Sequence, residues 1–120
     1  MQDHLRGKPK EAVALYHAFA RTVRGLGPGV RATSVKTGIS FMVRVRFAGA
    51  IVQRKGLRIG FWLKREIESP RFAKVEFIPP NNWIYHLKVR APEDLDRELL
   101  AWLSEAYRVG RQDHLVSHAK

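Results

Sequence analysis

The chain has 120 residues, the usual length of one domain, and it contains no cysteine. The lack of cysteine excludes disulfide bridges and thiolate metal sites. Its 22 lysines and arginines outnumber its 11 aspartates and glutamates, so the formal net charge is +11. A charge this positive favours polyanionic partners such as nucleic acid, an anionic membrane surface or an acidic protein. The alternative is a basic composition that serves only solubility or follows from a GC-rich genome.

The first ten residues, MQDHLRGKPK, contain no apolar segment that could serve as a signal peptide. The longest apolar runs are only a few residues, far short of the roughly 20 that a membrane-spanning helix needs. We therefore expect a soluble, cytoplasmic protein without a membrane partner. Residues 1–120 are expected to form a single α+β domain whose ends, 1–9 and 111–120, are flexible.

A first helix is predicted over residues 10–26. Its apolar residues recur at intervals of three and four positions, which places them on one helical face: Val13, Tyr16, Phe19, Ala20, Val23 and Leu26. The glycines and proline of residues 25–29 end this helix, because glycine adopts the left-handed cap and proline cannot continue a helix.

Five strands are predicted at residues 30–36, 39–47, 57–65, 72–78 and 83–90. The second and third carry the clearest signal, since apolar and polar residues alternate in both. The apolar row of the second strand is Ile39, Phe41, Val43, Val45 and Phe47, and that of the third is Leu57, Ile59, Phe61 and Leu63. Between them, Ala48-Gly49-Ala50 is expected to bend or bulge the chain, and Arg54-Lys55-Gly56 to turn it.

A last helix is predicted over residues 91–110, with Pro92 and two acidic residues in its first turn and Gly110 at its end. The short connections between strands favour antiparallel pairing of neighbours. The predicted fold class is therefore α+β. We expect a two-layer sandwich in which a five-stranded antiparallel meander is flanked by N- and C-terminal helices and its second sheet face stays open.

The polar rows of three predicted strands would share that open face. They supply a set of cationic and aromatic side chains: Arg44, Arg46, Arg58, Trp62, Lys64, His86, Lys88 and Arg90. Residues two apart on a strand are separated by ~6.6 Å, which is comparable to the phosphate spacing of a stretched nucleic-acid strand. Cations beside a flat aromatic residue form a recurrent platform for single strands. This set is the candidate site for nucleic acid or another anion.

Two other interpretations of the basic face stay open. An uncovered sheet face must be polar in any case, and arginine and lysine discourage aggregation there. The face could also be an interface for a second copy or another protein, although like charges oppose pairing of two such faces. The alternative function is accordingly a protein-interaction or accessory-subunit module that does not bind nucleic acid.

The sequence offers little material for catalysis. The acidic residues gather on the final helix, where capping and the helix dipole account for them. The glycines of LGPGV follow a helix, so they suit a cap better than a phosphate-binding loop. His114 and His118 could bind a metal together with Asp113, but a flexible tail is the simpler interpretation. We expect no enzymatic activity, no metal and no cofactor.

Several segments of the chain resemble one bacterial family: HLRGKP and LY near the start, LGPGV after the first helix, KTGISF and RFA in the strands, and DLDRELLAWLSEAY at the end. It is the family catalogued as domain of unknown function 5655, and the resemblance covers nearly the whole chain. Some relatives carry this domain beside others, including DNA-cleaving architectures of the restriction type. The resemblance therefore implies a nucleic-acid context, and it implies no catalytic residues.

Overall fold

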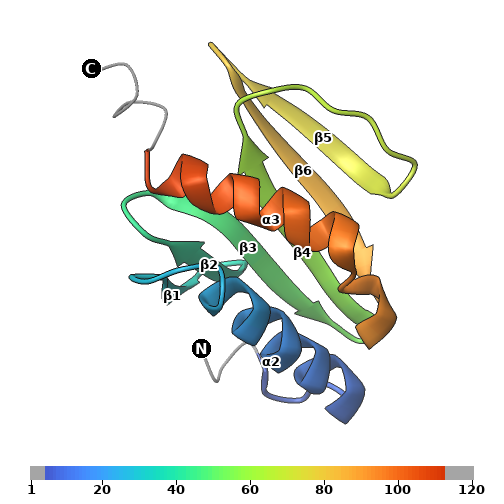
Figure 1. Ribbon diagram of the computed structural model, residues 1–120. Helices are drawn as coiled ribbons and strands as arrows, with labels where there is room; N and C mark the ends of the chain where they lie inside the picture. Colours follow the sequence, from blue (N-terminus) through green and yellow to red (C-terminus); the bar gives the residue numbers. More distant parts are fainter. Residues whose placement is uncertain (1–4, 113–120) are drawn as a thin grey trace.

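The computed structural model describes residues 5–112, which form one six-stranded sheet with two helices packed on the same face (Figure 1). The predicted α+β class is confirmed, and one helix stands before and one after the strands. The elements in chain order are α2 (Lys10–Arg24), β1 (Arg31–Val35), β2 (Gly38–Met42), β3 (Arg46–Gln53), β4 (Gly56–Leu63), β5 (Phe72–Ile78), β6 (Asn82–Val89), the 3₁₀ helix η1 (Pro92–Asp94) and α3 (Arg97–Gly110).

All neighbouring strands are antiparallel, in the order β1-β2-β3-β4-β6-β5. The predicted meander is correct from β1 to β4 and wrong beyond it, because β6 pairs with β4 and β5 forms the outer edge. The loop between β4 and β5 carries the chain past the position of β6, and Tyr85 of β6 holds this loop in place. Its hydroxyl accepts a hydrogen bond from the N–H of Ile67, at 2.7 Å, and donates one to the carbonyl of Arg65, at 2.9 Å.

The strand predicted over residues 39–47 is in fact two strands, β2 and β3, joined by a turn at residues 43–45. This turn accounts for the sixth strand. The N–H groups of Arg44 and Val45 both donate to the carbonyl oxygen of Gly110, at 3.2 and 3.0 Å. The end of α3 therefore fixes the turn from a distant part of the chain. Val45, expected in the core, is 39% exposed.

A β-bulge follows this turn and decides which way the start of β3 faces. Phe41 of β2 pairs with Ala48, whereas Met42 pairs with Arg46, so that Phe47 is the extra residue between them. Phe47 is completely buried, and its ring packs edge-on against Tyr107 of α3, with 5.7 Å between the ring centroids. The segment Ala48-Gly49-Ala50, expected to bend the chain, lies inside the regular part of β3.

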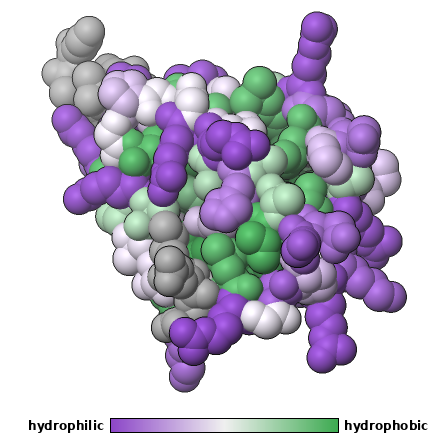
Figure 2. Space-filling model, turned by 90° about the horizontal axis from the view of Figure 1, so that it is seen from below, coloured by the Kyte–Doolittle hydropathy of each residue, from purple (hydrophilic) through white to green (hydrophobic). Residues whose placement is uncertain are grey.

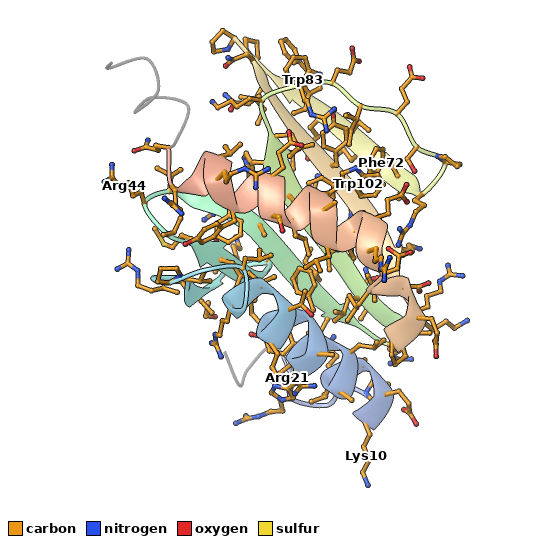
Figure 3. The ribbon with its side chains drawn as sticks, viewed as in Figure 1. Lys10, Arg21, Arg44, Phe72, Trp83 and Trp102 are labelled. Carbon is orange, nitrogen blue, oxygen red and sulfur yellow. The ribbon has the colours of Figure 1, made fainter. Side chains whose placement is uncertain are left out.

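The core fills the space between the helices and the sheet. Both helices contact β3 and β4, and their apolar stripes meet one row of each strand (Figure 1). Trp102 of α3 stacks on Phe61, at 5.8 Å between ring centroids, and lies against Phe72 at 5.1 Å (Figure 3). On the surface of the molecule seen from below, hydrophilic side chains project around a smaller hydrophobic area (Figure 2). The apolar rows predicted for β2 and β4 are therefore core rows, apart from the residues of the turn.

The last helix begins later than predicted, since residues 92–94 form η1 and α3 starts at Arg97. Asp96 is the N-cap of α3, and its carboxylate accepts a hydrogen bond from the N–H of Leu99 at 3.0 Å. The guanidinium of Arg71, from the loop before β5, donates to Asp96 at 3.0 Å and to Glu98 at 3.0 Å. One carboxylate thus starts the helix and anchors the loop.

Asp96→Ala and Asp96→Asn test this double role. The Leu99 N–H and then Arg71 hold the pKa of Asp96 below its ordinary value. The stability contributed by this carboxylate is therefore fully present above the pKa of an unfolded aspartate, ~3.9, and is lost as the pH falls through the lower folded pKa. Urea unfolding at pH 7 should show alanine to be more harmful than asparagine, which can still cap. The differences from wild type should shrink below about pH 4; differences that are unchanged at pH 2 would contradict this role.

Candidate nucleic-acid interface

One face of the sheet is left uncovered by α2 and α3, which both lie on the other side (Figure 1). Because side chains alternate along a strand, the residues between the core rows point to this open face. Arg58 and Trp62 stand between the buried residues Leu57, Ile59 and Leu63 of β4. The same pattern that builds the core therefore determines the composition of the open face.

The structure brings five of the predicted residues together on the open face: Arg46, Arg58, Trp62, His86 and Lys88. They lie on three adjacent strands, β3, β4 and β6, and the register places Arg58 directly opposite Lys88. Lys64 and Arg90 directly follow β4 and β6, at opposite ends of the face, since these strands are antiparallel. The Nζ of Lys64 donates a hydrogen bond to the Oδ1 of Asn82 at 2.6 Å.

Arg44 was predicted to be part of this face, and that prediction is wrong. It lies in the turn between β2 and β3, beyond the paired part of the sheet, and its side chain projects away at that end of the molecule (Figure 3). The reason is the turn itself, which interrupts the alternation on which the prediction relied. Arg46 keeps its place on the face only because the bulge at Phe47 restores the orientation.

The sequence pattern missed three charged residues of the open face. Arg31 of β1 pairs with Met42, and Lys74 and Glu76 of β5 pair with His86 and Ile84. The alternation of side chains along the predicted strands could have assigned Arg31 to the open face. The position of β5 beside β6, which brings Lys74 and Glu76 next to the other cations, has no signal in the sequence.

The Nε2 of His86 lies 2.7 Å from the Oε1 of Glu76, which joins β6 to β5 across the open face. Hydrogen bonding from His86, followed by the positive charges of Lys74 and Arg58, lowers the pKa of Glu76 below its ordinary value. Glu76 is the one acidic residue on the strands of this face within residues 5–112. The remaining acids of η1 and α3 lie in the helical layer: Glu93, Asp94, Asp96, Glu98 and Glu105. The strands of the sheet therefore carry almost no acidic residues, whereas the helices carry both acids and bases.

Two depressions adjoin on the open face. The first, of about 130 Å³, is lined by Ser40, Gly49, Gly60 and Arg58, among others. The second, of about 570 Å³, lies toward Lys64 and the end of α3. Arg46 and Trp62 line both, so they form the ridge between the two hollows. The arrangement offers cations on either side of an aromatic ring.

Comparison with known proteins agrees with the resemblance noted in the sequence. The family model described as "Domain of unknown function (DUF5655)" matches residues 1–110. The chain belongs to this family. Among curated proteins and solved structures, no significant match to this DUF5655 chain was found.

Two further properties bear on the predicted partners. Within residues 5–112, no helix is long and apolar enough to cross a membrane. In the same range, no three histidine, aspartate or glutamate side chains are grouped so that they could hold a metal ion. Asp113, His114 and His118, considered above as metal ligands, lie outside the described residues.

Lys88→Thr tests whether the open face carries electrostatic strain. Like charges directly opposite each other on neighbouring strands are destabilising, so relieving the Arg58–Lys88 repulsion should raise the free energy of unfolding by a few tenths of a kcal/mol. Lys74→Thr is the matched control, since Lys74 faces His86 and no arginine. Urea unfolding at low salt should separate the two variants, and about 1 M salt should reduce the difference by screening. Equal effects of both substitutions would contradict the repulsion.

Proposed function

We propose that this chain is a non-enzymatic binding module that holds single-stranded nucleic acid on its open sheet face. The observation that carries the proposal is the placement of Arg46 beside Trp62, with Arg58 and Lys88 farther along the same face, which no helix covers. Cations supply contacts to phosphates, and a half-buried aromatic ring such as that of Trp62 supplies a surface on which a base can stack.

The spacing along β4 supports a single strand that runs with this β-strand. Arg58 and Trp62 lie on the same side of β4 with Gly60 between them, and Lys64 directly follows the strand. Alternate residues of an antiparallel strand are about 6.8 Å apart, so Arg58 lies roughly 14 Å from Trp62, about two phosphate spacings of an extended chain. A cation near each end of the track and an aromatic ring between them match the alternation of phosphates and bases.

The width of the face favours a single strand over a duplex. Six strands at about 4.8 Å spacing form a surface roughly 24 Å across, whereas the major groove of B-DNA is about 12 Å wide. A sheet of this width does not enter the groove to read base edges. An unpaired strand can instead lie flat across it, with its bases exposed to the protein.

The proposal is tested by fluorescence anisotropy with a labelled single-stranded oligonucleotide. Contacts to about four phosphates should give a slope of about −3 in a plot of log K against log salt, at roughly −0.7 per contact. Arg58→Ser combined with Lys88→Ser should weaken binding and reduce the slope by about 1.4, because two contacts are lost.

The matched control is Lys10→Ser combined with Arg21→Ser. Both residues lie on α2, in the helical layer, and the double variant has the same net charge as the first (Figure 3). It should bind nearly as tightly as wild type if the open face is the binding surface. Equal losses of affinity in the two variants would mean that only the total charge of the protein matters, which contradicts a binding surface on the open face. Absence of binding even at low salt would refute the proposal.

A further inference from the structure

The smaller depression in the open face has a floor almost free of side chains. Gly49 of β3 pairs with Gly60 of β4, and Ser40 of β2 pairs with Gly49 on the other side. Three small residues thus stand side by side across three neighbouring strands. Longer side chains surround this floor, among them those of Arg58 and Trp62. The result is a flat, shallow hollow of about 130 Å³.

The glycines are what keep this hollow open. A Cβ atom added to Gly49 would lie 3.3 Å from the carbonyl oxygen of Ile39, and one added to Gly60 would lie 3.3 Å from Nδ1 of His86. The imidazole of His86 therefore rests close to the bare backbone of β4, held by its hydrogen bond to Glu76. Glycine is costly inside a strand, because it packs nothing and loses more backbone entropy than other residues. At Gly60 the group that approaches the backbone is the imidazole of His86. Over Gly49 only a backbone oxygen comes near, so a ligand group can approach the backbone there.

Ser40 adds an unused polar atom to the same floor. Its side chain is buried although it belongs to the uncovered face, with only 4% of the residue exposed. Its Oγ has no hydrogen-bond partner among the described residues. A buried hydroxyl without a partner is destabilising, so a ligand atom that bonds to it gains the interaction without displacing another.

The size and walls of the hollow point to one planar ring. Its volume is well below the roughly 300–1,000 Å³ typical of pockets for complete small-molecule ligands. The indole of Trp62 and the guanidinium of Arg46 separate it from the larger depression. A ring seated on the glycines would thus lie beside an aromatic face, with cations nearby for the phosphate attached to it.

We propose that this hollow holds one unpaired base of the bound strand, flat over Gly49 and beside Trp62, with His86 as one of its walls. The inference rests on the proposed function and names what the site recognises: a base as well as the phosphates. Affinity should therefore depend on the presence of bases, beyond what charge alone supplies. A duplex, whose bases are stacked and paired, cannot enter the hollow without unpairing.

The test compares two labelled strands of about 12 nucleotides, a length within the usual site sizes. One is oligodeoxythymidine, and the other has the same phosphates but abasic sites in place of every base. Anisotropy titrations with the wild-type chain should give at least about tenfold tighter binding of the strand with bases, since stacking of a single base is worth this much. Equal binding of both strands overturns the inference and leaves the proposed function intact. No binding of either strand refutes the proposed function itself.

Gly49→Ala and Ser40→Ala test whether the base binds in this hollow. Gly49→Ala should bring thymidine binding down toward the abasic value and leave abasic binding unchanged. Gly25→Ala, at the end of α2, is the control, since its added Cβ also comes 3.3 Å from a backbone oxygen, that of Arg21. Ser40→Ala should retain the melting temperature, because it removes an unpaired hydroxyl, and should still weaken thymidine binding about threefold. Folded variants that bind both strands as wild type does would exclude this hollow as the base site.

Discussion

The packing of both helices on the same side of the sheet is the constraint on which the rest of this structure depends. Alternation along β3, β4 and β6 puts a continuous apolar row under α2 and α3, where Ile59, Phe61 and Leu87 are completely or almost completely buried. The same alternation sends Arg58, Trp62 and His86 to the opposite side. Core and candidate site are therefore two faces of the same strands, and neither can shift in register without the other.

The open face contains features that stability alone does not explain. Arg58 faces Lys88 across two central strands, and Gly49 faces Gly60 beside them. Repulsion and missing side chains both weaken a sheet. Both pairs lie near Ser40, whose buried hydroxyl has no hydrogen-bond partner among the described residues. The destabilising features of the sheet are thus found at one place on its surface. An anionic ligand with a flat ring would offset all three.

Period-two alternation was enough to predict β4, β5 and β6 within a residue or two and to place five residues of the candidate site. It failed at residues 43–45, because Val43 and Val45 continue the alternation and no glycine or proline marks the turn. That turn is fixed by the carbonyl of Gly110, a tertiary contact that a local pattern cannot contain. The position of β5 at the outer edge, beyond β6, likewise depends on tertiary structure and has no local signal in the sequence. Gly49 was visible in the sequence, but its partner Gly60 became meaningful only once the register of β3 and β4 was known.

NMR titration of the isotope-labelled chain with a single-stranded oligonucleotide can show whether the uncovered sheet face is the binding surface. The largest changes in chemical shift should fall on the amides of Gly49 and Gly60 and on the indole N–H of Trp62, with α2 little affected. Changes centred on α2 or α3, or scattered evenly over the surface, would contradict binding at that face.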